Sequence, residues 1–329
     1  MDYILDIYRN EVENHASSKA RDDVNAILAD DFTLRYYSEG SNPFTKLMNW
    51  HKVMKELKKK ADMILLQYPA CTKLITAKTF DKLQDKDLIF LVHDIETLRT
   101  RAPKDKVDAE IGYLNKAKVV ISHNAHMTKW LKENGLTSKV VDLGIFDYLY
   151  EGTRQEIKSY TNAIAFAGNL SKEKSAFVYD KDFAKIGITL YGPNFAGEQE
   201  GLLYKGSLPS DKLPLMVQER FGLVWDGTSL DECTGNTGVY LKYNNPHKTS
   251  LYLSAGMPVI VWNQAAIADF VRENHVGLCV SSLYDLKDIL ASLSEEEYQI
   301  MRKNAEKIAE KLRNGYYTKL AIEKAKSNF

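Results

Sequence analysis

Two basic residues stand at the expected start of a helix in the segment YNNPHKTSLYLSAGMPVIVW. Asn245 is a good N-cap, Pro246 suits the first helical position, and Gly256 is placed where the helix should end. The first turn then carries His247 and Lys248, although the free N–H groups there favour negative charge. The segment therefore predicts an anion site, with a solvated lysine on a surface helix as the alternative.

A second loop of similar chemistry occurs in AFAGNLSKEKSAF. Gly168 and Asn169 leave an expected strand, and Lys172 follows where a helix should begin. Small residues allow the backbone to approach a ligand closely, and a lysine beside free amides suits a diphosphate. The chain contains no G-x-x-x-x-G-K loop and no G-x-G-x-x-G fingerprint, so the prediction depends on the two loops together.

Short β-rich runs alternate with amphipathic stretches along the chain, which indicates parallel α/β sheets. The runs of the first half are residues 2–8, 32–38, 62–68, 87–94 and 117–123, and those of the second half are 162–170, 187–193, 201–207, 221–227, 257–263 and 275–281. Two such halves predict two Rossmann-like, doubly wound domains. Both basic loops follow carboxyl ends of strands, where ligands of such sheets collect.

The pattern restarts after a polar link near Gly152. We therefore expect an N-terminal domain over residues 1–152 and a second domain over residues 153–310. The charged tail has no strand, and its last part, residues 311–329, is expected to be a helix that returns to the N-terminal domain.

Composition excludes several classes of protein. Lys+Arg and Asp+Glu both number 44, so the net charge is zero and nucleic acid is a poor candidate partner. Cys71, Cys233 and Cys279 have no metal-type spacing and are interpreted as cytosolic thiols. No leader and no apolar run of the ~18 residues that span a bilayer occurs, so we expect a cytoplasmic protein, with recruitment to a membrane left open.

Several segments carry a resemblance to a known family: AGNLSK, LLYKGSLPSDKLP, FGLVW, PHKTSLYLSAGMPVIV and NGYYTKLAIE. The chain resembles bacterial nucleotide-sugar glycosyltransferases, among them the glucosyltransferases that extend glycans of serine-rich repeat adhesins, and galactofuranosyltransferases. The resemblance implies the GT-B fold, in which two Rossmann-like domains face a cleft. It also implies that the C-terminal domain binds the donor and the N-terminal domain the acceptor.

The resemblance implies particular donor-binding residues. Lys172 and Lys248 match basic positions near the donor phosphates, Tyr204 matches a tyrosine near the nucleotide, and Ser18 matches a hydroxyl residue that reaches the donor. Ser17 and Ser18 also suit an N-cap of the following helix, and both roles are compatible. The full set predicted to bind the donor is Ser18, Gly168, Asn169, Lys172, Tyr204, Asn245, His247, Lys248, Thr249 and Ser250.

The implied reaction is transfer of a hexosyl unit from UDP-glucose or UDP-galactofuranose to a sugar acceptor on a glycoprotein or surface polysaccharide. Leu251 stands where many retaining GT-B enzymes have a glutamate, so inversion is preferred. No cofactor or metal is expected, because lysines and helix-end amides can neutralise the leaving diphosphate. The D-x-D triplets at residues 85–87 and 180–182 are interpreted as solvated turns, and His123 with His126 lacks further ligands for a metal.

An inverting transfer needs a base for the acceptor hydroxyl. The run DLIFLVHDIETLR ends a buried strand in His93 and Asp94, so both are expected at a carboxyl edge. Asp94 is the preferred base, with His93 as the other candidate. The structural alternatives are a helix cap for the aspartate and a core histidine with satisfied nitrogens.

Two other function classes stay open. A non-catalytic partner of a glycosylation complex would keep the fold and lose the chemistry. A nucleotide-sugar epimerase would normally need the dinucleotide fingerprint that is missing. The expected partners are thus a UDP-sugar and a glycan acceptor, and self-association is left open.

Overall fold

The computed structural model describes residues 1–7, 16–37, 42–69, 81–83, 85–152, 164–197 and 202–329. The chain forms two compact units. The first comprises Met1–Leu143 and Tyr317–Phe329, and the second comprises Gly144–Tyr316. The last helix thus belongs mainly to the first unit, where Lys326 Nζ lies 2.9 Å from Asp2 Oδ2.

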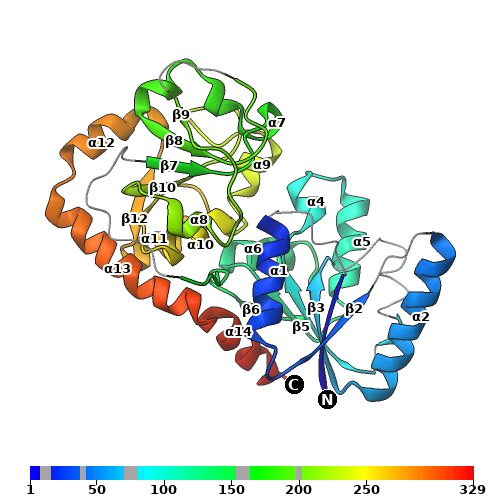
Figure 1. Cartoon of the computed structure of the whole chain (residues 1–329). Coiled ribbons are helices and arrows are strands. Elements are labelled where there is room, and N and C mark those ends of the chain that lie inside the picture. Colours follow the sequence, from blue (N-terminus) through cyan, green and yellow to red (C-terminus); the bar gives the residue numbers. More distant parts are fainter. Residues whose placement is uncertain (8–15, 38–41, 70–80, 84, 153–163, 198–201) are drawn as a thin grey trace. The chain divides into compact units, whose positions relative to one another are not determined.

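The first unit is a parallel sheet of six strands in the order β2-β1-β3-β4-β5-β6, with helices packed around it (Figure 1). The residues of the inner strands β3, β4 and β5 are mostly apolar and buried, as expected where both faces of a sheet are covered, whereas the edge strands β2 and β6 are mostly exposed or half-buried. The elements are β1 (Asp2–Ile7), α1 (Ala16–Ile27), β2 (Thr33–Tyr37), α2 (Pro43–Lys60), β3 (Met63–Tyr68), β4 (Asp87–Val92), α4 (Glu96–Arg99), α5 (Lys104–Leu114), β5 (Val119–Ser122), α6 (Ala125–Glu133), β6 (Lys139–Asp142) and α14 (Tyr316–Lys326).

The second unit has a sheet of the same kind, in the order β12-β11-β10-β7-β8-β9, again all parallel. Its strands are β7 (Ile164–Ala167), β8 (Ile188–Tyr191), β9 (Leu203–Tyr204), β10 (Phe221–Val224), β11 (Val259–Trp262) and β12 (Gly277–Val280). Its helices are α7 (Lys172–Ser175), η1 (Ala176–Tyr179), η2 (Phe183–Ile186), α8 (Leu213–Met216), α9 (Gly235–Tyr240), α10 (His247–Ser254), α11 (Ile267–Asn274), η3 (Leu283–Asp285), α12 (Leu286–Ser292) and α13 (Glu295–Arg313).

Each sheet has one point at which the strand order reverses. In the first unit it lies between β1 and β3, because β2 is added on one side of β1 and β3 on the other. In the second unit it lies between β7 and β10 for the same reason. Ligands of open α/β sheets bind outside the carboxyl ends of the strands at such points. The topology alone therefore indicates one candidate ligand-binding position in each unit.

The predicted fold class is confirmed, since both halves are doubly wound parallel α/β units. Residues 139–142 form a sixth strand of the first sheet that the sequence pattern had not indicated. This edge strand is only four residues long and has just one fully buried residue, Val141, so it lacks a recognisable apolar run.

Tyr252 fixes helix α10 at the reversal point of the second sheet. Its hydroxyl accepts a hydrogen bond of 2.6 Å from the backbone amide of Ala167, at the end of β7. Its ring lies over Gly222 in β10, where a Cβ would lie only 2.1 Å from the ring. Helix α10 ends where expected, because Gly256 has a φ of +68° just after the C-cap. Packing thus directs the start of α10 to the carboxyl ends of β7 and β10.

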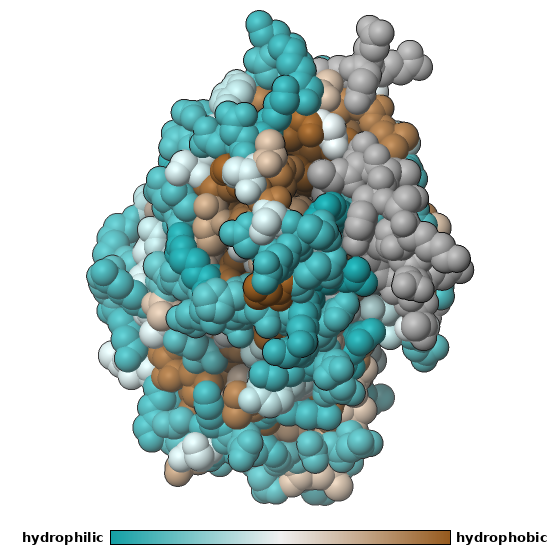
Figure 2. Space-filling view, turned by 90° about the vertical axis from the view of Figure 1, so that its left-hand side faces the viewer, coloured by the Kyte–Doolittle hydropathy of each residue, from teal (hydrophilic) through white to brown (hydrophobic). Residues whose placement is uncertain are grey.

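Hydrophilic residues cover most of the face drawn in Figure 2, with hydrophobic residues in separate groups. Among the described residues, no helix combines the length and the hydropathy that a bilayer crossing requires.

Candidate functional site

Lys248 lies at the reversal point of the second sheet. Its ammonium donates to Trp225 O at 3.0 Å and to Asp226 Oδ1 at 2.9 Å, both just beyond β10. It also lies 4.8 Å from the ring of Phe166 in β7, and a Cβ at Gly168 would be 3.9 Å from it. Because the side chain is only 15% exposed and ion-paired, the alternative of a solvated surface lysine is wrong.

The start of α10 differs from the prediction by one residue. Pro246, not Asn245, is the N-cap, and its side chain makes no capping hydrogen bond to the first turn. Asn245 is buried and donates instead to Gly144 O at 2.9 Å, so tertiary packing has displaced it from the capping role. A helix start without a side-chain cap retains N–H groups that an anion can meet.

Three neighbouring residues predicted to bind the donor face the protein interior. Thr249 and Ser250 are 0% and 1% exposed, and no hydrogen-bond partner of Thr249 Oγ1 is found among the described residues. The ring of His247 packs 4.9 Å from that of Tyr148. Thr249 and Ser250 thus pack in the interior, whereas the ammonium of Lys248 lies beside the end of β10.

The loops after β7 and β8 are in direct contact. Gly192 has a φ of +132°, and a Cβ on it would lie 1.8 Å from Gly168 O, so only glycine permits this approach. Asn169 Oδ1 accepts from the backbone amide of Ser171 at 2.9 Å and from Asn194 Nδ2 at 3.1 Å. The predicted glycine–asparagine turn is thus held in one conformation beside Lys248.

Lys172 and Tyr204 both lie next to a stacked pair of aromatic rings, those of Tyr179 and Phe195. Lys172 is exposed in the first turn of α7, and its Nζ is 5.4 Å from the ring of Tyr179. That ring stacks on Phe195 at 5.8 Å, and Phe195 contacts the ring of Tyr204 at 4.7 Å. Tyr204 is 39% exposed and donates to Gly192 O at 2.8 Å. The arrangement offers a cation and half-exposed aromatic rings beside the glycine loops.

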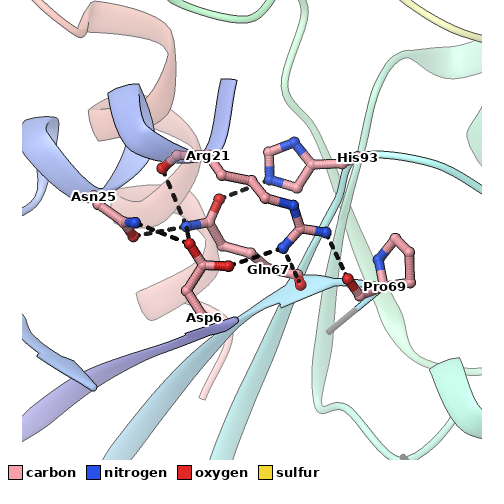
Figure 3. A network of polar contacts seen from close by, with 6 residues as sticks. All are labelled: Asp6, Arg21, Asn25, Gln67, Pro69 and His93. Atoms are coloured by element: carbon pink, nitrogen blue, oxygen red, sulfur yellow. Dashed lines mark hydrogen bonds and ion pairs between the residues drawn. The ribbon is translucent and has the colours of Figure 1, made fainter. Parts of the chain in front are cut away.

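In the first unit, a buried polar network occupies the reversal point (Figure 3). Asp6 of β1 is fully buried and accepts from Arg21 Nη1 at 3.1 Å and from Asn25 Nδ2 at 3.0 Å. Arg21 also donates to the carbonyl oxygens of Gln67 at 2.9 Å and Pro69 at 2.5 Å. A buried carboxylate is tolerated only when paired and hydrogen-bonded, and this one is both.

Gln67 connects the network to His93. Its Nε2 donates to Asn25 Oδ1 at 2.7 Å and to Arg21 O at 3.2 Å, so its Oε1 must be the atom that faces the imidazole. His93 Nε2 lies 2.7 Å from that oxygen and therefore carries a proton (Figure 3). The network thus selects the tautomer in which Nε2 carries the proton.

Asp94 follows β4, as predicted, and its side chain is 35% exposed. The N-cap position of α4 is Ile95, not Asp94, and the carboxylate of Glu110 in α5 binds the first turn of that helix. The Glu110 carboxylate accepts from the backbone amides of Glu96 at 3.2 Å and Thr97 at 2.9 Å. Asp94 instead lies 3.7 Å from Arg99 Nη1, which leaves its carboxylate in a partly solvated ion pair.

Ser18 lies in the first turn of α1, which begins at Ala16, so it is not the N-cap of that helix. It is half-buried and lies on the same helix as Arg21 and Asn25. The side chain of Ser17 and the whole of Cys71 fall outside the described residues.

The other candidates for metal chemistry are separated in space or occupied. His123 is buried, its Nε2 donates to Val92 O at 3.0 Å, and burial lowers its pKa to about 4, whereas His126 is exposed. Asp180 Oδ1 accepts from the amide of Asp182 at 2.9 Å in a turn, and Asp87 pairs with Lys118. In the ranges that the structure describes, no three His, Cys, Asp or Glu side chains are grouped to hold a metal ion.

Sequence reasoning missed Asp226, Gly192 and the network around Asp6 and Gln67. A usable pattern existed, because Asp6 and Gln67 each follow a run of apolar residues near the carboxyl end of a strand. Asp226 likewise follows the apolar run FGLVW directly. A polar residue at the carboxyl end of a buried strand is expensive to bury without a purpose.

The fold is shared with solved glycosyltransferases. The structure of Anabaena Alr3699/HepE in complex with UDP and glucose matches with a TM-score of 0.65 and 13% identity, over 99% of each chain. WaaG, a glycosyltransferase involved in lipopolysaccharide biosynthesis, matches with a TM-score of 0.54 and 10% identity, over 99% of this chain and 98% of that one. The two doubly wound units are therefore those of the GT-B fold.

Sequence comparison identifies the family. The models of the Glucosyltransferase 3-like N-terminal and C-terminal domains match residues 1–145 and 164–325. The chain belongs to this family and is a glycosyltransferase. Beta-1,6-galactofuranosyltransferase WbbI of Escherichia coli (strain K12) is 37% identical over 74% of this chain and 72% of its own length. Glucosyltransferase 3 of Streptococcus gordonii is 27% identical over 73% and 71%, respectively.

Proposed function

We propose that this enzyme transfers a hexosyl unit from a UDP-sugar to a sugar acceptor on a glycoprotein or surface polysaccharide, with inversion and without a metal ion. The donor would be UDP-glucose or UDP-galactofuranose. The observation that carries the proposal is the start of α10, where the N-cap makes no side-chain hydrogen bond and Lys248 lies beside Gly168 at the reversal point of the second sheet.

The chemistry of this place suits a diphosphate. An ammonium has three N–H groups, and Trp225 O and Asp226 Oδ1 account for two of the contacts of Lys248. The third N–H, together with the first amides of α10, would bind phosphate oxygens, and Lys172 would add a second cation. Donors already held in place stabilise the charge that develops on UDP as it leaves.

The names of the relatives support the two candidate sugars. WbbI is named a galactofuranosyltransferase, and its 37% identity exceeds the 27% of the glucosyltransferase of Streptococcus gordonii. Galactofuranose as the transferred sugar is therefore the first donor to test. Both donors carry the same UDP group, so the proposed binding of the diphosphate is the same for either. Only the contacts to the sugar would differ.

The proposed reaction is a single displacement. The acceptor oxygen forms a bond to the anomeric carbon while the bond from that carbon to the UDP oxygen breaks, and a base takes the hydroxyl proton. Asp94 is proposed as this base, with His93 as the other candidate. Ser18 and Tyr204 are proposed as further donor contacts.

Replacement of Asp94 tests the base. A general base typically contributes on the order of a hundredfold or more, so Asp94→Asn should lower kcat by about that factor while UDP affinity is kept. Asp105→Asn, a change at an exposed aspartate of the same unit, should have no effect. Turnover of Asp94→Asn at the parent rate would reject this role, and a product that retains the donor's anomeric configuration by NMR would reject inversion.

Metal independence has its own test. Transfer should continue in excess chelator, because lysines and helix amides are proposed to neutralise the leaving group. Loss of activity with chelator, followed by recovery with manganese, would contradict the proposal.

A further inference from the structure

Helix α2 exposes large apolar side chains on its first turns. Phe44, Leu47 and Met48 are 70%, 44% and 57% exposed, and their i, i+3, i+4 spacing puts them on one face. Twelve large hydrophobic side chains are exposed among the described residues, and three of them lie within these five consecutive positions. Isolated exposed apolar residues are ordinary, whereas a group of this kind indicates an interaction surface.

The same face becomes strongly basic toward the end of the helix. Lys52, Lys55 and Lys59 continue the row from Met48 in steps of four, three and four residues, and all three are exposed. The helix has six lysines and one glutamate, whereas the whole chain has no net charge. The carboxylate of Glu56 is already paired, with Arg35 at 3.0 Å and Lys60 at 3.5 Å.

The opposite face of α2 holds the helix on its unit. Trp50, Val53, Met54 and Leu57 are 0–4% exposed and belong to the core. The helix flanks β2, the edge strand of the sheet (Figure 1). The outer face of α2, defined by Phe44, Leu47, Met48, Lys52, Lys55 and Lys59, is therefore not required to fold the first unit.

We propose that the outer face of α2 docks this enzyme onto an anionic lipid bilayer. Apolar side chains would enter the boundary between headgroups and acyl chains, while the lysines meet lipid phosphates. The combination of protruding apolar groups and exposed lysines favours a bilayer, because a bilayer supplies both an apolar layer and negative charge without a shaped pocket.

Vesicle co-sedimentation with the purified full chain tests this proposal. The parent should bind vesicles of phosphatidylcholine mixed with phosphatidylglycerol, and binding should weaken with added salt and with phosphatidylcholine alone. Lys52→Gln/Lys55→Gln should weaken binding about twenty-fivefold, at about fivefold per lysine. Phe44→Ser should weaken it at least about tenfold, because it removes an inserting side chain.

Matched changes on α13 serve as controls. Lys303→Gln/Lys307→Gln removes the same charge from exposed positions, and Ile300→Ser removes an apolar side chain that is 53% exposed. Both controls should bind like the parent, and all variants should melt at the parent temperature because the positions are exposed. No binding to either vesicle type, as an acidic protein partner for α2 would give, overturns the proposal. Equal losses in the α13 controls also overturn it.

Discussion

Replacing Lys248 by methionine, alone and together with Asp226→Asn, separates donor binding from stability. Lys248 and Asp226 form an ion pair of 2.9 Å, and their side chains are only 15% and 12% exposed. The single change would leave the carboxylate without its cation. The double change removes both charges and nearly preserves the shape of the site.

The two effects have different magnitudes in the two variants. Loss of a charge-assisted hydrogen bond from Lys248 to the diphosphate costs about 1.5–3 kcal/mol, so UDP should bind about 10-fold to 150-fold more weakly in both variants. An uncompensated carboxylate at Asp226 costs on the order of 3 kcal/mol of stability, so Lys248→Met alone should melt well below the parent. The double variant should recover most of that loss.

Calorimetric titration with UDP and thermal unfolding of each variant provide the measurements. Lys185→Met/Asp182→Asn is the control, because it removes a lysine–aspartate pair that is largely exposed to solvent, at 75% and 30%, from the same unit. The control should keep both UDP affinity and melting temperature, since exposed pairs contribute little. Parent-like UDP affinity in Lys248→Met/Asp226→Asn would refute the assignment of Lys248 to the diphosphate.

Three further predictions follow from the structure. Gly192→Ala should destabilise the second unit and weaken UDP binding, because the new Cβ would overlap a backbone oxygen. The control Gly206→Ala has open space around its Cβ and should show only the smaller cost of a φ of +79°. Equal effects of the two changes in calorimetry would contradict this prediction. Burial lowers the pKa of His123 to about 4, so the folded chain stays neutral there while the unfolded chain gains a proton below about pH 6.5. Denaturant titrations should therefore show about 3 kcal/mol of stability lost between pH 6.5 and pH 4, a loss absent from His123→Asn. Gln67→Leu should remove the acceptor of the His93 Nε2 proton, so ¹⁵N NMR should show a single tautomer in the parent and a mixture in the variant, with identical spectra counting against the network.

The sequence predicted much of the architecture, because parallel strands buried on both faces leave continuous apolar runs. It also placed Gly168, Lys172 and Lys248 at carboxyl ends of strands or at helix starts, where the structure has them. The short edge strand at residues 139–142 was missed because it has little apolar character of its own.

Local patterns failed where tertiary contacts decide the role of a side chain. Asn245 suits an N-cap by residue type, yet its amide donates to Gly144 O, about one hundred positions earlier in the chain. The carboxylate that binds the first turn of α4 comes from Glu110, which lies on another helix. The partners of Lys248 and His93 depend on which strands are neighbours. Single-sequence patterns do not contain that information.

The most direct test of the central claim is the release of UDP from a panel of nucleotide sugars by the purified enzyme with a glycan acceptor in excess chelator. Either UDP-galactofuranose or UDP-glucose should be the donor. The release of UDP from it should fall sharply in Lys248→Met/Asp226→Asn. Turnover confined to GDP- or dTDP-sugars, or turnover of a UDP-sugar that the double variant leaves unchanged, would contradict the account.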